Sequence, residues 1–224
     1  MKLHSWDITP AEGIALQKRL AGDVRVEPLV GEIETVAGTD CAFARGGREI
    51  LAMAVLCDAQ SMELLATAYV RRPCTFPYVP GLLSFREAPA VIEAVEKLPR
   101  RPGLLMCDGQ GRAHPRRLGL ASHVGLWLDL PTIGVAKSRL CGEHRAPGER
   151  RRCHTQLRLG GEVIGSVVRT RTSVRPLYVS VGHRITLAEA VAWTLRCTRG
   201  VRLPEPTRLA DRLVARRKAE LAGS

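Results

Sequence analysis

Apolar and polar positions in the first third of the chain predict one helix followed by three strands. The segment TPAEGIALQKRL places Thr9 ahead of Pro10 and Glu12, which is a capping box with proline at the first helical position, and it predicts a helix over residues 10–21. Three apolar runs of strand length follow, over residues 36–43, 50–57 and 64–70. The segment ARGGRE between the first two runs is typical of a hairpin.

The middle of the chain switches between helical and strand-like patterns. After the proline-rich segment RRPCTFPYVPG, we expect Pro89 to begin a helix, and Pro115 to begin another. The apolar positions of these two helices are Val91, Ile92 and Val95, then Leu120, Val124, Trp127 and Leu128. Residues 104–107 and 132–136 are short apolar runs, of the kind that forms central strands buried on both faces.

The last third begins with a basic loop over residues 139–152. The elements expected after it are a pair of strands, over residues 162–168 and 177–181, and a final basic helix over about 207–221. Between them, Thr186 and Glu189 form a second capping box and predict a helix that ends before Gly200. Meandering strands followed by alternating helices and strands predict an α/β fold, a mixed sheet flanked by helices on both faces, in a single domain over residues 1–224.

Composition narrows the class of protein. The chain has 45% apolar residues, no apolar core of signal-peptide length near its start and no run close to the ~18 apolar residues of a membrane span. We therefore expect a soluble, cytoplasmic protein with no membrane partner. Seven cysteines without a CxxC pair are expected to be reduced thiols. Cys153 and His154 are an alternative zinc pair, but no second pair stands at zinc-like spacing.

Positive charge is concentrated in the second half of the chain. The net charge is +12; residues 1–111 contain 12 Lys and Arg against 14 Asp and Glu, and residues 112–224 contain 22 against 8. A basic half favours a polyanionic partner, most often nucleic acid. The alternative is a compositional bias, because 29 of the 34 basic residues are Arg.

Three acidic residues stand inside or at the ends of apolar elements. Asp40 lies inside the first strand-like run, Glu87 precedes the predicted second helix, and Asp108 ends the run LLMC. Buried acids are costly unless they are paired or bind a metal, and three that converge would repel one another without a cation. Hard oxygen ligands suit Mg²⁺ or Mn²⁺. Together with the basic second half of the chain, the three acidic residues favour a metal-dependent reaction on a phosphodiester.

Each candidate also has an ordinary structural interpretation. Asp108 begins an Asp-Gly pair that is common in turns, and Glu87 could close a capping box with Ser84. Lys137 follows the apolar run TIGVA, either as a snorkelling cation or as a charge held over a phosphate. His114 could cap a helix, donate to a phosphate or assist proton transfer.

Five segments of the sequence together resemble one known family. In chain order they are AGTD, PYVPGLLSFREAP, CDGQGRAHPRRLGLASHVGL, PTIGVAKSRL and RLPEPTRLAD. They are similar to the motifs of endonuclease V, a family of nucleases that nick DNA near deoxyinosine, and the resemblance runs from about residue 36 to 212. It implies a ribonuclease H-like fold, in agreement with the predicted order of elements.

The resemblance also implies roles for individual residues. Asp40, Glu87 and Asp108 match the family's metal-binding carboxylates. Lys137 matches its catalytic lysine, and His114 matches a histidine near the scissile phosphate. The substrate-binding residues implied are the wedge Pro77, Tyr78, Val79 and Pro80, and the lining of a pocket for the flipped base, Gly81, Leu83, Gly109 and Leu120. Some relatives carry His in place of Asp211, which is either a fourth acid near the metal or an ordinary helix residue.

The reaction implied is Mg²⁺-dependent hydrolysis of the second phosphodiester 3′ to deoxyinosine, with Mn²⁺ as a possible substitute ion. The products would carry 3′-hydroxyl and 5′-phosphate ends, and the nick would begin DNA repair. The expected partner is DNA containing deoxyinosine, bound by a monomer. The alternatives are an inosine-directed ribonuclease, a structure-specific nuclease on the same scaffold, or a DNA-binding protein without catalytic activity.

Overall fold

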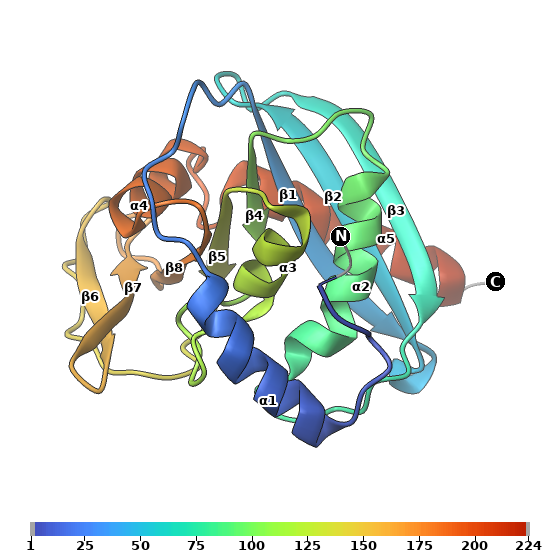
Figure 1. The fold of residues 1–224 in the computed structure, drawn as a ribbon. Helices are drawn as coiled ribbons and strands as arrows, with labels where there is room; N and C mark the ends of the chain where they lie inside the picture. The colour runs from blue at the N-terminus through green and yellow to red at the C-terminus, as the bar shows by residue number, and fades with distance from the viewer. Residues whose placement is uncertain (1–2, 223–224) are drawn as a thin grey trace.

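The residues that the structure describes, 3–222, form a mixed sheet of eight strands in the order β3-β2-β1-β4-β5-β8-β7-β6 (Figure 1). The structure is a computed structural model. Its strands are β1 (Thr35–Ala44), β2 (Glu49–Asp58), β3 (Leu64–Pro73), β4 (Leu104–Cys107), β5 (Thr132–Ala136), β6 (His154–Leu159), β7 (Glu162–Val168) and β8 (Leu177–His183). The central strands β1, β4 and β5 are parallel, and the other neighbours are antiparallel.

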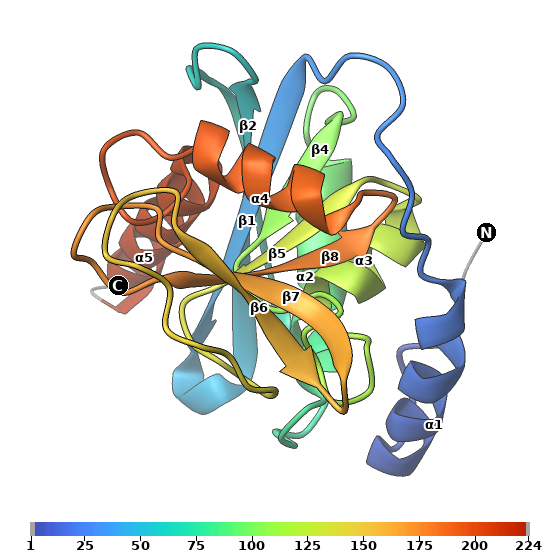
Figure 2. The same cartoon turned by 90° about the vertical axis from the view of Figure 1, so that its left-hand side faces the viewer.

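Helices cover both faces of this sheet (Figures 1 and 2). The helices are α1 (Pro10–Leu20), α2 (Leu83–Glu96), α3 (Leu120–Leu128), α4 (Leu187–Arg196) and α5 (Glu205–Ala222), with 3-10 turns η1 (Ala21–Asp23) and η2 (Arg45–Gly47). Side chains alternate along the strands, so Ala37 packs with α2 and α3 while Val36 packs on the other face with α4. The α5 helix covers β1 and β2 on that second face.

The predicted α/β class, a ribonuclease H-like mixed sheet flanked by helices on both faces, is confirmed. Both capping boxes are present as predicted, Thr9 with Glu12 at α1 and Thr186 with Glu189 at α4. The predicted strand over residues 132–136 coincides with β5. Local signals were sufficient here because caps and short apolar runs depend on few neighbours in sequence.

Two predicted helix starts are wrong. The second helix begins at Leu83 rather than at Pro89, and its apolar side extends backwards through the buried Phe85 and Ala88. That packing outweighs the hydrogen bond that a proline removes inside a helix. The residue before this helix is Leu82, without a side-chain cap, so the capping box considered for Ser84 and Glu87 is also wrong.

The third helix begins at Leu120 rather than at Pro115. Arg117 adopts a positive φ of 59°, which a right-handed helix does not accommodate. The intervening residues turn back on themselves, since the N–H of Gly119 donates to the carbonyl of Gly111 at 3.0 Å. This turn takes the place of the helical hydrogen bonds expected from a helix that begins at Pro115.

One strand was missed. Residues 154–159 form β6 at the sheet edge, where only Leu157 is buried, so the segment lacks the apolar pattern by which strands are predicted. It pairs antiparallel with β7, and the predicted pairing of residues 162–168 with 177–181 is confirmed as β7 and β8.

The seven cysteines are all free thiols. Cys153 and His154 are absent from the residue group that could hold a metal within the described part of the chain, so the zinc alternative has no support. No helix among residues 3–222 has the length and apolar character needed to cross a membrane.

Candidate active site

Strand register places Asp40 and Asp108 side by side. In the parallel pair of β1 and β4, Thr39 lies opposite Cys107, so the next residue of each strand is an aspartate. The N–H of Asp108 donates to the carbonyl of Thr39 at 3.2 Å and extends this pairing by one bond. Two acids far apart in sequence therefore emerge at one point, as expected for Asp40 inside the first strand and Asp108 at the end of the fourth.

A third acid arrives from the C-terminal helix. Asp211 lies on α5, whose first turn crosses the sheet directly over Gly38 of β1; a Cβ on Gly38 would lie 2.2 Å from the carbonyl carbon of Pro206. Only glycine permits this close approach. As a result, carboxylate oxygens of Asp40, Asp108 and Asp211 lie within 4.8 Å of one another. Asp211 is thus a member of the acidic group rather than only a helix residue.

Lys137 lies at the same point, one residue beyond β5. Its Nζ lies 2.6 Å from Oδ2 of Asp108 and 2.8 Å from Oδ1 of Asp211. Partial burial alone would lower the pKa of Lys137, but the hydrogen bonds and charges of these two carboxylates raise it above its ordinary value. Lys137 is therefore a permanent cation at neutral pH.

The acids are held in an environment that opposes their negative charge. Burial, followed by the charge of Asp108, raises the pKa of Asp40 to about 7. Burial also raises the pKa of Asp108, although Lys137 counteracts it. For Asp211 the ion pair with Lys137 outweighs burial and lowers its pKa. Clustered carboxylates that resist ionisation fit a hard divalent cation, because such an ion relieves both the burial and the repulsion.

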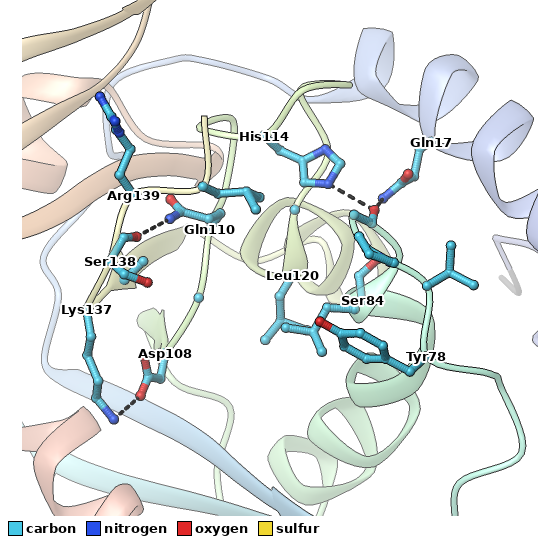
Figure 3. Close-up of a pocket in the computed structure, with 18 residues that line it drawn as sticks. Gln17, Tyr78, Ser84, Asp108, Gln110, His114, Leu120, Lys137, Ser138 and Arg139 are labelled. Carbon is cyan, nitrogen blue, oxygen red and sulfur yellow. Dashed lines mark hydrogen bonds and ion pairs between the residues drawn. The ribbon is translucent and has the colours of Figure 1, made fainter. Parts of the chain in front are cut away.

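A pocket of about 440 Å³ opens beside Asp108 and Lys137 (Figure 3). Its lining contains most of the residues predicted to meet the substrate, namely Tyr78, Val79, Pro80, Gly81, Leu83, Gly109 and Leu120, together with Asp108, His114 and Lys137. Pro77, Asp40 and Glu87 are not part of this lining. The acidic group and the pocket therefore share a wall formed by Asp108 and by Lys137, which is ion-paired with it.

The remaining lining was not predicted. These residues are Gln17, Ser84, Gln110, Gly119, Ala136, Ser138, Arg139 and Leu140. Most of them lie inside the five segments that resemble endonuclease V, next to residues predicted to line the pocket. Those segments could therefore have identified them. Gln17 had no such signal, because it lies on α1, far from any of those motifs in sequence.

Tyr78 stands at the rim of the pocket with 73% of its surface exposed. Tyr78 therefore does not cover the core beneath the proline-rich loop. The guanidinium of Arg86 lies 5.9 Å from the centre of its ring. An exposed aromatic beside a pocket is free to stack on a base.

Comparison with known proteins decides the family. The sequence profile of Endonuclease V matches residues 18–212. A protein from Azotobacter vinelandii named Endonuclease V is 51% identical over 212 residues, covering 95% of this chain and 96% of that protein. The chain belongs to the endonuclease V family. It is therefore a nuclease, a hydrolase that acts on DNA.

Solved structures of the family have the same fold. The Streptomyces avermitilis Endonuclease V superposes with a TM-score of 0.92 at 42% identity, covering 97% of this chain and 96% of that one. A Ciona intestinalis Endonuclease V, in complex with a 23mer DNA containing an inosine followed by a ribo-adenosine, superposes with a TM-score of 0.82 at 23% identity, covering 96% and 100%.

In this endonuclease V family protein, Glu87 stands slightly apart from the other acids. It lies on α2, is 9% exposed, and does not belong to the group within 4.8 Å. Burial, and then the charges of Asp40 and Asp108, raise its pKa to about 8. Its carboxylate is thus close enough to interact with both aspartates, and a cation there would favour its ionised form.

His114 makes two hydrogen bonds within the protein. Its Nε2 donates to the carbonyl of Gly81 at 3.0 Å, and its Nδ1 accepts from the N–H of Arg116 at 3.1 Å. Burial and the neighbouring charge of Arg116 lower its pKa to about 4, so the ring is neutral. The predicted contact with a phosphate would require His114 to give up one of these bonds.

Proposed function

We propose that this protein recognises deoxyinosine in DNA and hydrolyses the second phosphodiester bond 3′ to it, leaving 3′-hydroxyl and 5′-phosphate ends. The observation that carries the proposal is the shared wall of the acidic group and the pocket. Asp108 belongs to both, and Lys137 lines the pocket while pairing with Asp108 and Asp211, so a base held in the pocket keeps its own strand beside the carboxylates. Recognition and hydrolysis can then occur at a fixed separation along one strand.

The pocket suits a base that has left the duplex. Its volume lies within the usual range of small-molecule sites, and its wall combines apolar Leu83 and Leu120 with backbone groups at Gly81 and Gly109. An enzyme that reads a single base inside a duplex must extrude it, at a cost of a few kcal/mol. Tyr78 at the rim can fill the gap that the base leaves, as apolar wedges do in other DNA-distorting proteins.

The residues beside the pocket account for the chemistry. Asp40, Asp108 and Asp211, with Glu87 nearby, would hold a divalent ion, which we propose to be Mg²⁺. When bound, that ion supplies charge neutralisation and activation of water. Lys137 places a positive charge where negative charge develops on the phosphate. Burial makes Asp40, Asp108 and Glu87 reluctant to ionise, and a bound divalent ion would favour their ionised, ligating forms.

Family membership supports deoxyinosine as the lesion, and the Ciona intestinalis relative binds a DNA that contains inosine. The second candidate is inosine in RNA. The proposal includes Mn²⁺ as a substitute ion, a monomer as the active unit and the cytoplasm as its compartment.

The test is a nicking assay on matched DNA and RNA strands with one inosine, in Mg²⁺, Mn²⁺ or EDTA. We expect Mg²⁺-dependent nicking of the DNA at one position. Asp108→Asn, which removes an ionised oxygen without changing shape, should abolish nicking and retain binding. Preference for the RNA strand would favour the second candidate. Near-normal nicking by Asp108→Asn in Mg²⁺ would refute the role of the acidic group.

A further inference from the structure

Three side chains converge on the carbonyl oxygen of Gly81. Gln17 donates through Nε2 at 3.0 Å, His114 through Nε2 at 3.0 Å, and Arg116 through Nη2 at 2.8 Å. Figure 3 shows Gln17 and His114 pointing at this oxygen from two different parts of the chain. One of the three donors is charged, which strengthens its bond. Few backbone carbonyls have so many donors, so this peptide is held firmly.

Gln17 connects the three segments that meet there. Its side chain is fully buried; Nε2 also donates to the carbonyl of Leu118 at 3.0 Å, and Oε1 accepts from Nε of Arg116. Both amide hydrogens and the amide oxygen are therefore used. The helix that carries Gln17 lies outside the sheet and packs through Leu16 and Leu20.

The held peptide belongs to the turn that presents the rim of the pocket. The N–H of Leu82 donates to the carbonyl of Val79 at 2.9 Å, across Pro80 and Gly81. Proline followed by a residue with positive φ, here 79° at Gly81, is the pattern of a type II turn. A Cβ on Gly81 would lie 2.7 Å from Nη2 of Arg116 and would displace the guanidinium from its present position.

This turn sets the position of two exposed apolar residues. Tyr78 precedes Val79 directly, and Leu83, 41% exposed, follows Leu82; both line the pocket. A loop ordered before the substrate arrives does not have to be ordered during binding, which lowers the cost of association. The benefit is largest for a duplex, where the rim must replace stacking lost by the extruded base.

We propose that Gln17, together with His114 and Arg116, is a set of positioning residues that fixes the Gly81 peptide and so holds Tyr78 and Leu83 ready at the rim. The proposal rests on the proposed function and adds to it. In this role His114 uses both ring nitrogens within the protein and transfers no proton. Gln17 then contributes to duplex recognition although it lies on a helix that has no other part in the site.

The decisive variant is Gln17→Met, which keeps the volume but removes the donors and acceptor. Its control is Thr194→Val on α4, which removes a buried side-chain hydrogen bond elsewhere in the fold, from Thr194 to the carbonyl of Ala190 at 2.7 Å. We expect Gln17→Met to raise the KM for deoxyinosine duplex about tenfold, the scale of the one hydrogen bond to Gly81 that is lost, with a smaller change on single strands. Equal changes on both substrates, or the same change in Thr194→Val, would overturn the proposal.

A second measurement needs no substrate. Hydrogen exchange of the segment around residues 78–83, including the Leu82 amide, should be faster in Gln17→Met than in the unmodified protein and unchanged in Thr194→Val. Unchanged exchange in Gln17→Met would refute the positioning role even if nicking were altered. If the unmodified protein failed to nick deoxyinosine DNA, the proposed function would fail while the exchange result still decided the positioning role.

The positioning role of His114 can be tested separately, through the pH dependence of nicking. His114→Ala should lower duplex nicking but leave both limbs of the pH–rate profile in place, because a positioning residue moves no proton. Disappearance of one limb would assign proton transfer to His114 and remove it from the positioning set.

Discussion

The Nζ atom of Lys137 lies 2.6 Å from Oδ2 of Asp108, and the same nitrogen reaches Asp211 at 2.8 Å. One lysine therefore bridges an acid from the end of β4 and an acid from α5. A divalent ion bound by these carboxylates would compete with the ammonium for them. The lysine, 40% exposed, could then turn towards a phosphate beside the pocket whose wall it forms.

This relationship predicts how Lys137→Ala behaves. Its charge should act mainly on the transition state, so the chemical rate should fall by at least ~100-fold, the scale of a lost electrostatic donor. Single-turnover kinetics at saturating enzyme separates this rate from affinity. A defect in affinity alone would reassign Lys137 to an ordinary contact with the DNA backbone.

The exposure of Tyr78 predicts a substrate-dependent defect. Tyr78→Ala should reduce nicking of deoxyinosine in duplex about tenfold or more, the scale of one lost base-stacking contact, and should affect single strands less. Because the side chain is 73% exposed, the melting temperature should not change. Equal losses on both substrates, accompanied by a lower melting temperature, would contradict the wedge role.

The basic second half predicts a salt-dependent affinity. Log affinity for duplex should fall with log salt by about 0.9 per phosphate neutralised. Arg152 and Arg196 line one pocket with two further arginines, Arg151 and Arg199. Changing Arg152 and Arg196 together to Gln should make the slope less steep if phosphates contact this surface.

The control for that experiment is the pair Arg216 and Arg217, which both form ion pairs with Glu220. Neutralising them should alter the slope less, because their charges are already partly compensated. An affinity that does not depend on salt in the unmodified protein would mean that the charge is a compositional bias and contacts no phosphate.

A buried histidine predicts the response of stability to acid. Burial, and then the charge of His4, lower the pKa of His123 to about 3, and its Nε2 lies 2.7 Å from that of His4. The unfolded chain takes up a proton near the ordinary histidine pKa of 6.5, while the folded protein does not. The free energy of unfolding is therefore unaffected by this group above pH 6.5, and this group lowers it as the pH falls from 6.5 towards 3.

Each pH unit below 6.5 should cost about 1.4 kcal/mol of unfolding free energy from this group. Denaturant titrations between pH 7 and pH 5 measure the loss. His123→Gln should show a smaller loss over that range, whatever its stability at pH 7. An identical loss in the variant would show that other groups control the acid response.

Features that depend on near neighbours in sequence were determined by the sequence alone. The capping box of Thr9 and Glu12 and the apolar run over residues 132–136 specify their elements locally. Asp40 and Asp108 were also recognisable, because an acid at an apolar strand requires a partner or a cation. The five segments that resemble endonuclease V identified most of the pocket wall, because each segment is continuous in the sequence.

Only the tertiary structure decided which distant groups meet. Asp211 joins the acids because Gly38 lets α5 approach the sheet, and Gln17 reaches Gly81 across 64 positions of sequence. The start of α2 ahead of Pro89 was likewise decided by packing rather than by the local preference of proline. Such contacts depend on how layers of the fold pack together, and the energy of that packing is not contained in any short segment of the chain.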